Sequence, residues 1–260
     1  MNIEQIKNKD RKKMKKGIFL LPNIFTTANL FAGCFSIFCA IDGNYQSSAV
    51  AIFVAVFLDG LDGKVARATN AVSDFGKDYD SLCDLVSFGI APAIFYYSWT
   101  SNNPYDLVTV RMTWLVSFFY IATTALRLAR FNNHLQLKEE NHFLGLPSPA
   151  AATLCTVIIW QCDLNYIDPI LSYIFISIAM LSSSCLMVSN IKYNSFKDTR
   201  SLNRIPFSKT LLVPLILILI FLNPPLVLTI MSVTYLFSGP ITLIRDLIMK
   251  KKTSLKQDPE

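Results

Sequence analysis

Four aspartates lie in two pairs whose spacing can bring them together. Asp59 and Asp62 are at positions i and i+3, so they share one face if their segment is helical. Asp80 and Asp84 are at i and i+4 and share a face in the same way. The two apolar segments form an antiparallel hairpin if the chain turns near residues 70–73, with each pair at a similar distance from the turn. The four carboxylates are therefore expected to converge near one end of the hairpin.

Carboxylates gathered in an apolar environment repel one another and lose hydration. A single carboxylate at the middle of a membrane costs ~3 kcal/mol even on the milder insertion scale. A hard divalent cation relieves both effects, and Mg²⁺ prefers carboxylate oxygens and commonly works beside substrate phosphates. Two such ions can hold the attacking and leaving oxygens of a phosphoryl-type displacement. The spacing thus predicts a metal site formed by Asp59, Asp62, Asp80 and Asp84.

The segments that position these residues are apolar enough to cross a membrane. The chain of 260 residues is 52% hydrophobic and 16% charged, which favours an integral membrane protein over a soluble domain. A spanning helix needs ~20 mostly apolar residues. The sequence predicts an all-α membrane protein with about eight transmembrane helices, at residues 20–41, 48–68, 78–99, 108–131, 147–161, 167–189, 209–222 and 224–247.

The basic residues indicate how these helices are oriented. If the helices alternate in direction, all 24 Lys and Arg residues except Arg111 fall on the side of the two chain termini. Cytoplasmic loops carry such an excess, so both termini and the metal site, at the end of the second and third helices, are predicted to be cytoplasmic. The expected domains are a basic juxtamembrane segment (1–19), a transmembrane domain (20–247) and a basic cytoplasmic tail (248–260).

The net charge of +6 does not by itself indicate nucleic-acid binding. The basic run "KNKDRKKMKK" directly precedes the first predicted helix, where it is attracted to anionic lipid headgroups. The same run also serves to set the topology, and the sequence leaves both interpretations open. We therefore expect anionic membrane lipids, and no nucleic acid, among the partners of the protein.

The aspartates belong to a longer motif, D-x2-D-G-x2-A-R-x8-G-x3-D-x3-D. This motif resembles the signature of the CDP-alcohol phosphatidyltransferases. The resemblance implies an integral membrane enzyme in which a hydroxyl group displaces CMP from a CDP-linked lipid or alcohol. It also implies that the four aspartates hold two metal ions, Mg²⁺ or Mn²⁺, and that Asp84 is the general base.

Two groups of residues are expected to bind the nucleotide. The first belongs to the motif: the resemblance implies that Gly63 and Ala66 line the nucleotide pocket, and Arg67 and Gly76 are candidates from the same motif. The second is a polar stripe in the first predicted helix, where Asn23, Thr26 and Asn29 follow one another at i, i+3 steps. This stripe either faces the cytidine diphosphate or forms hydrogen bonds across packed helices.

Further stretches resemble one branch of that family, the membrane-embedded bacterial-type phosphatidylserine synthases. They are "ALRLARFN", "FLGLPSPAAA", "CLMVSNIKYNSFK" and "YLFSGP". This resemblance implies CDP-diacylglycerol as donor and L-serine as acceptor, although Asn190 stands where a basic residue is expected. The serine carboxylate or a phosphate needs a fixed cation, and the same basic residues also set the topology. The candidates are Arg127, Arg130, Lys192 and Arg200.

Two alternatives remain open at this point. Within the same family, the acceptor can be glycerol 3-phosphate or a polyol phosphate instead of serine. A divalent-cation transporter also contains intramembrane acids, but its acids would trace a path across the bilayer instead of gathering near one face. The preferred interpretation is a multi-pass enzyme of the cell (inner or plasma) membrane with its active site facing the cytoplasm, and it is compatible with a homodimer.

Overall fold

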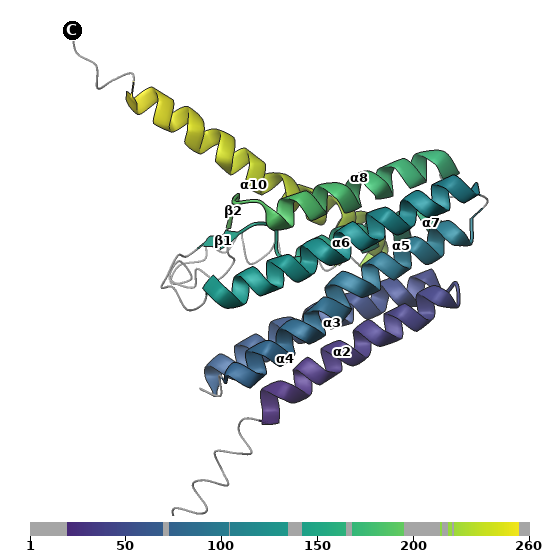
Figure 1. Cartoon of the computed structure of the whole chain (residues 1–260), viewed down its shortest axis with the longest axis horizontal. Helices are drawn as coiled ribbons and strands as arrows, with labels where there is room; N and C mark the ends of the chain where they lie inside the picture. The colour runs from purple at the N-terminus through teal and green to yellow at the C-terminus, as the bar shows by residue number, and fades with distance from the viewer. Residues whose placement is uncertain are drawn as a thin grey trace, which may run out of the picture. The chain divides into compact units, whose positions relative to one another are not determined.

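The computed structural model describes residues 20–69, 73–103, 105–134, 142–164, 168–194, 214, 218–219 and 221–254. These residues are helical apart from turns, short connections and one small two-stranded sheet (Figure 1). The chain divides into two compact units, Met1–Gln136 and Leu137–Glu260. Each unit has its own helices and is described separately below.

In the first unit one helix contacts most of the others. Its elements are α2 (Leu20–Ile41), α3 (Tyr45–Ala68), α4 (Asp74–Asp84), η1 (Leu85–Ile90), α5 (Ala91–Ser101) and α6 (Leu107–His134). The helix α2 packs against α3 and also contacts α4, η1 and α5 (Figure 1). The helix α6 packs on α5 and η1. The aspartates of the motif all lie in this unit, on α3 and α4.

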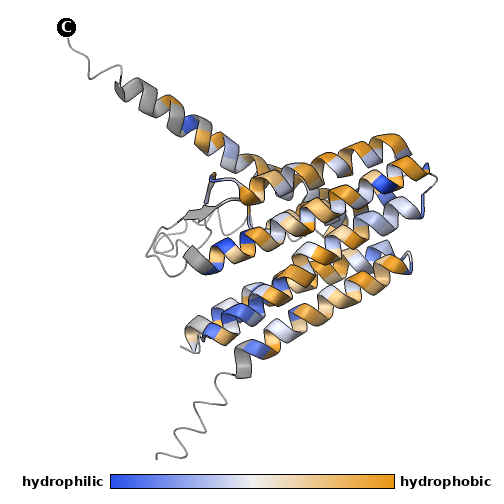
Figure 2. Ribbon diagram, in the orientation of Figure 1, coloured by the Kyte–Doolittle hydropathy of each residue, from blue (hydrophilic) through white to orange (hydrophobic). Residues whose placement is uncertain are grey.

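Small residues allow α2 and α3 to pack closely. Ala40 and Ala49 have no exposed surface, and the hydroxyl oxygens of Ser36 and Ser48 lie 2.9 Å apart between the two helices. Small side chains let helix backbones approach one another in a membrane, and hydroxyl pairs add hydrogen bonds between them. Phe31 of α2, by contrast, is 72% exposed. Apolar residues occur along most of the helices, as expected for surfaces that face lipid (Figure 2).

The third predicted transmembrane segment is one continuous helix, at residues 74–101, with a π-helical part at η1. Pro92 lies just after η1 and has no N–H with which to bond the Phe88 carbonyl. The hydroxyl of Tyr120 on α6 donates to that carbonyl instead, at 3.1 Å. The π-helical part directly follows Asp84, and π-bulges are frequent at functional sites.

The second unit combines three helices with the small sheet. Its elements are β1 (His142–Leu144), α7 (Ser148–Leu164), α8 (Pro169–Val188), β2 (Lys192–Asn194) and α10 (Pro224–Ser254). The helix α7 packs against α8 and α10, and α10 also contacts β2. The strands β1 and β2 pair antiparallel, with Phe143 opposite Tyr193.

Three stretches that are far apart in the sequence meet in this second unit. Gly145 follows β1 with φ +80°, and a Cβ there would collide with the Met187 carbonyl at the end of α8. Tyr193 of β2 is fully buried, and its hydroxyl donates to the Leu236 carbonyl of α10 at 3.1 Å. A Cβ at Gly239 would collide with the Tyr193 ring. We call the contact of Tyr193 with Leu236 and Gly239 the Tyr193 junction. This junction joins the stretches "CLMVSNIKYNSFK" and "YLFSGP". The stretch "FLGLPSPAAA" lies next to it, because its Phe143 pairs with Tyr193 in the small sheet.

The helices match the predicted transmembrane segments except at 209–222, most of which lies outside the described residues. Five helical stretches are long and apolar enough to cross a membrane: Asn23–Ile41, Asp74–Ser101, Leu107–Asn132, Pro169–Val188 and Pro224–Leu243. The helices α3 and α7 are not among these five. A helical membrane protein is thus supported. The number of eight spans, the cytoplasmic termini and the three domain boundaries stay predictions.

The all-helical fold class is confirmed, and the short strands β1 and β2 are a part of the described structure that the sequence did not indicate. Each strand has only three residues, so neither can show the alternating pattern by which strands are read from sequence. Their pairing depends on the contact between segments that flank α7 and α8, which no local pattern indicates. The helix α10 also continues to Ser254, within the predicted cytoplasmic tail.

Candidate metal centre

Three of the four predicted metal ligands meet in the first unit. Asp59 and Asp62 on α3 and Asp80 on α4 each place one carboxylate oxygen within 4.8 Å of the other two. We call these three residues the acidic triad. Asp62 is buried and the other two are half-buried. The helical hairpin expected from the spacing therefore brings these three carboxylates together.

The acidic triad suits a hard divalent cation. Its donor atoms are all carboxylate oxygens, which are ligands for Mg²⁺ and Mn²⁺ and not for soft ions. The Oδ1 atom of Asp80 is buried and has no hydrogen-bond partner among the described residues. A buried polar group without a partner costs about 1–3 kcal/mol, and more if it is charged. A cation bound at this oxygen would remove that penalty.

Asp84 lies one helical turn beyond Asp80 of the acidic triad and is the most deeply buried aspartate of α4. It is the last residue of α4 and is 8% exposed. Its Oδ1 accepts a hydrogen bond from Asn29 Nδ2 of α2 at 3.1 Å. Asn29 follows Thr26, which bonds to Asp62, by about one turn of α2, so Asp62 and Asp84 lie in two successive layers along that helix.

The polar stripe of α2 faces these aspartates. Thr26 Oγ1 donates to Asp62 Oδ2 at 3.0 Å, and Asn29 bonds to Asp84 in the next layer. Both α2 residues are buried, with exposures of 4% and 0%. Hydrogen bonding across packed helices therefore explains why polar residues stand at positions 26 and 29, whereas a contact of either residue with the nucleotide stays a prediction.

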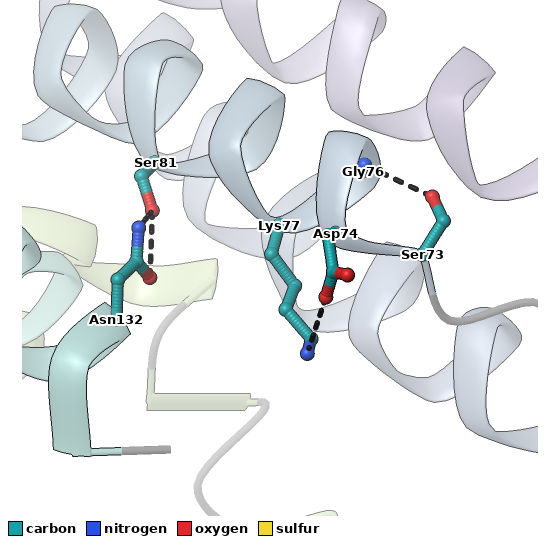
Figure 3. A network of polar contacts seen from close by, with 6 residues as sticks. All are labelled: Ser73, Asp74, Gly76, Lys77, Ser81 and Asn132. Atoms are coloured by element: carbon teal, nitrogen blue, oxygen red, sulfur yellow. Dashed lines mark hydrogen bonds and ion pairs between the residues drawn. The ribbon is translucent and has the colours of Figure 1, made fainter. Parts of the chain in front are cut away.

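The motif glycines have different surroundings. A Cβ at Gly63 would meet none of the described atoms within 4 Å, so the surface of α3 beside Asp62 is open there. A Cβ at Gly76 would lie 3.0 Å from Ser73 Oγ and 3.7 Å from Asn23 Oδ1. Ser73 caps α4 by accepting a hydrogen bond from the Gly76 N–H at 3.0 Å (Figure 3). Gly76 thus lets the start of α4 approach α2. The side chains of Ala66 and Arg67, in the last turn of α3, lie outside the described residues.

Polar contacts around the site were not predicted from the sequence. The Tyr79 hydroxyl lies 3.0 Å from Thr27 Oγ1 and joins α4 to α2. Ser81 Oγ lies 3.2 Å from Asn132 Oδ1 and 3.0 Å from its Nδ2, which joins α4 to α6 (Figure 3). The available signal was the position of these polar residues next to the motif and at the end of "ALRLARFN". Their partners depend on how the helices pack.

Two of the predicted substrate-binding cations lie in the same unit as the aspartates. Arg127 and Arg130 are half-buried residues of α6. Arg127 lies on α6 between the residues that bond to Phe88 and to Ser81. It is therefore level with the part of α4 and η1 that contains Asp84. The exposed Asn190 precedes β2, and the side chain of Lys192 and all of Arg200 lie outside the described residues.

The chain is similar to several enzymes over much of its length. The family model described as CDP-alcohol phosphatidyltransferase matches residues 19–187. A CDP-diacylglycerol–serine O-phosphatidyltransferase from Helicobacter pylori is 34% identical over 225 residues, which cover 86% of this chain and 91% of the relative. The enzyme of the same name from Bacillus subtilis is 36% identical over 177 residues, 68% of this chain and 91% of the relative. An archaetidylserine synthase from Methanothermobacter thermautotrophicus is 34% identical over 175 residues, 66% of this chain and 69% of the relative.

The matched region contains the acidic triad, Asp84 and the polar stripe of α2. Its extent and the identity to these relatives are sufficient to show the family. The resemblance first drawn from the aspartate motif is confirmed. The chain belongs to the CDP-alcohol phosphatidyltransferase family, a family of phosphotransferases.

Proposed function

We propose that this member of the family transfers a phosphatidyl group from CDP-diacylglycerol to L-serine, giving phosphatidylserine and CMP. The acidic triad is the observation that carries the proposal, because three carboxylate oxygens within 4.8 Å of one another suit metal-assisted displacement at phosphorus. Serine is supported by the names of the H. pylori and B. subtilis relatives. The comparisons give no support to a divalent-cation transporter.

The metal ions are expected to bind on the two layers of carboxylates. Asp59, Asp62, Asp80 and Asp84 would hold two divalent ions, Mg²⁺ or Mn²⁺. When bound, such ions neutralise phosphate oxygens and stabilise the charge that develops during displacement. The unpartnered Oδ1 of Asp80 and the absence of soft donor atoms in the triad support hard cations.

The reaction is a substitution at the phosphorus atom attached to diacylglycerol. The serine hydroxyl oxygen forms a new bond to phosphorus, and the bond from phosphorus to the CMP oxygen breaks. The hydroxyl proton passes to Asp84, which acts as the general base and must lie about 2.6–3.2 Å from that hydroxyl. The burial of Asp84 and its hydrogen bond from Asn29 support this role, because both restrict the carboxylate to one position.

The substrates would approach the aspartates from the open surface of α3. The absence of described atoms within 4 Å of an added Cβ at Gly63 supports a nucleotide there. The other proposed nucleotide-binding residues are Ala66, Arg67, Gly76, Asn23, Thr26 and Asn29. Arg127 is the best-placed cation for the serine carboxylate or a phosphate because it is level with Asp84, and a guanidinium binds such groups through two parallel hydrogen bonds. Arg130, Lys192 and Arg200 are the remaining candidates.

The proposed setting is the cell (inner or plasma) membrane, with eight spans, both termini in the cytoplasm and the site facing the cytoplasm. The five long apolar helices support a multi-pass membrane protein, and the distribution of Lys and Arg supports this orientation. Anionic lipids at the basic N-terminal segment and a homodimer belong to the same proposal.

Transfer of labelled L-serine into lipid tests the proposed function. The purified protein in vesicles containing CDP-diacylglycerol should form phosphatidylserine and CMP in equal amounts when Mg²⁺ or Mn²⁺ is present. Asp80→Asn is the control for activity from contaminating enzymes, and labelled glycerol 3-phosphate is the competing acceptor. Transfer to glycerol 3-phosphate alone would favour the alternative acceptor. Transfer to neither acceptor, in an assay in which the H. pylori enzyme is active, would contradict the proposal.

A further inference from the structure

The helix α2 carries no acidic residue, yet it directly contacts two of the four aspartates. Thr26 donates to Asp62 at 3.0 Å and Asn29 donates to Asp84 at 3.1 Å. Each of these four residues is 8% exposed or less, and Asn29 has no exposed surface. Hydrogen bonds to a carboxylate are strong, and they are stronger where water is excluded. α2 therefore influences the direction in which these two carboxylates point.

Asn29 is itself held in place by η1. Ser87 Oγ donates to the backbone carbonyl of Asn29 at 3.0 Å. About one turn further along α2, a Cβ at Gly33 would lie 2.8 Å from the Ser87 Cα, so the two backbones are in close contact. Because Ser87 follows Asp84 on the same continuous helix, these contacts determine how far Asn29 lies from Asp84.

The side chain of Asn29 is directed at Asp84. An ionised carboxylate only accepts hydrogen bonds, so the amide nitrogen must be the atom that faces it. Among the described residues, the bond to Asp84 is the one side-chain hydrogen bond of Asn29, and its Oδ1 is buried without a partner. A leucine has a similar size and would fill the same space without leaving a buried polar atom. The amide therefore matters for Asp84 more than for helix packing.

We propose that Asn29 is a positioning residue, which holds the Asp84 carboxylate for proton transfer and acts on the reaction through Asp84 instead of through the nucleotide. This inference rests on the proposed function, and for Asn29 it replaces the nucleotide contact proposed from the sequence. A displacement of about 1 Å at a reacting group can reduce turnover about 10²-fold. Loss of an outer partner of a metal ligand typically weakens metal binding about 10–100-fold.

Asn29→Leu removes the hydrogen bond at nearly constant volume. At saturating metal we expect kcat to fall about 10²-fold, with KM for CDP-diacylglycerol unchanged. Mn²⁺ binding, followed by electron paramagnetic resonance without substrate, should weaken about 10–100-fold. Ser36→Ala is the matched control, since it removes a buried hydrogen bond of α2, to Ser48 of α3, outside the site. It should change neither the kinetic constants nor Mn²⁺ binding.

A double-mutant cycle with Asp84→Asn tests whether the effect runs through Asp84. If it does, Asn29→Leu has little further effect on turnover or Mn²⁺ binding in the Asp84→Asn background. Additive losses would contradict the proposal. A raised KM at unchanged kcat would also contradict it, because that result indicates a direct contact between Asn29 and the nucleotide.

Two further measurements keep the test decisive. If Asn29→Leu does not fold, Ser87→Ala frees the Asn29 carbonyl and should lower kcat without changing KM, and an unchanged kcat would overturn the proposal. Mn²⁺ binding requires no substrate, so it tests the coupling of Asn29 to Asp84 separately from catalysis. A wild-type protein that binds Mn²⁺ with this coupling but transfers no serine would contradict the proposed function and not the positioning of Asp84.

Discussion

The two units use polar side chains differently. In the first unit some hydroxyl groups bond to their own helix, as Thr124 does to the Tyr120 carbonyl, but several side chains on different helices bond to each other, as in Thr26–Asp62 and Ser81–Asn132. In the described part of the second unit, most hydroxyl groups bond to a carbonyl of their own helix, as Ser184 does to the Met180 carbonyl at 2.8 Å. Such bonds satisfy the hydroxyl locally and do not orient a neighbouring helix.

The joint between elements in the second unit is correspondingly one of packing. At the Tyr193 junction an aromatic ring lies against Gly239, and its hydroxyl bonds to a backbone carbonyl. The two units have similar apolar helices but differ in the contacts that hold their elements together. The first unit holds buried carboxylates in place, which requires specific polar side chains on other helices, whereas the Tyr193 junction depends mainly on close packing, with one hydrogen bond to a backbone carbonyl. We expect substitutions in the first unit to change chemistry and substitutions at the Tyr193 junction to change stability.

Removal of divalent metal should have the largest effect of all. If the aspartate layers bind the catalytic ions, treatment with excess EDTA and dialysis should abolish serine transfer, because no described group of the site replaces the charge of the ions. Added Mg²⁺ or Mn²⁺ should restore activity, whereas the thermal unfolding of the second unit should be little changed. Full turnover in the presence of EDTA would contradict the role assigned to the first unit.

Substitution of single aspartates should separate the two roles within the first unit. Asp84→Asn keeps the volume and an oxygen atom but removes most of the basicity, so turnover should fall roughly 10²–10⁴-fold while binding of the CDP-lipid survives. Asp59→Asn should weaken metal binding, and its activity should be partly recovered at high Mg²⁺. Titration of both variants with Mg²⁺ is the measurement. An equal response of the two would mean that Asp84 acts chiefly as a metal ligand.

Two glycine substitutions should have opposite consequences in the two units. Gly239→Ala places a Cβ in collision with the Tyr193 ring, so it should destabilise the fold by about 1–3 kcal/mol and lower the apparent Tm. Gly63→Ala meets none of the described atoms within 4 Å and replaces glycine within a helix, so the Tm should stay equal or rise. If Gly63 lies at the nucleotide, this second variant should raise KM for CDP-diacylglycerol. A lower Tm for Gly63→Ala than for Gly239→Ala would reverse the comparison.

Loss of the Tyr193 hydroxyl should have the smallest effect. Tyr193→Phe removes the bond to the Leu236 carbonyl and should cost about 1 kcal/mol at neutral pH. Burial, with a smaller contribution from Tyr235, raises the pKa of Tyr193 to about 12. The hydroxyl therefore stays protonated in the folded protein while the unfolded one ionises near pH 10, and wild-type stability is lost progressively as pH rises from about 10 to about 12.

Unfolding in detergent at increasing pH checks this sign. The stability difference between wild type and Tyr193→Phe should shrink as pH passes 10, because only the wild type must retain a buried proton. A difference that grows with pH would show that the phenol ionises readily in the folded state and that the Tyr193 junction is open to water.

Much of the helical framework could be predicted because apolar runs of membrane length leave a chain few other choices. The segments at 20–41 and 108–131 are helical as expected. The π-helical part of the third segment could not be predicted, because it reflects Pro92 together with a hydroxyl supplied by another helix. The strands β1 and β2 were missed for a related reason, since each is defined by its partner.

For the site, the sequence alone determined which residues can share a face. The helical period places Asp59 with Asp62 and Asp80 with Asp84, and it aligns Thr26 with Asn29 on α2. These relations are local, so they do not depend on what the helices pack against.

Only the tertiary structure decided how those faces meet. It brings three carboxylates into the acidic triad and encloses Asp84 beside Asn29, and it turns the stripe of α2 toward acids instead of leaving it unpaired. The physical reason is that the rotation and depth of one helix against another depend on close contacts such as Gly33 with Ser87. Residues that are distant in the sequence make those contacts, and the helical period carries no information about them.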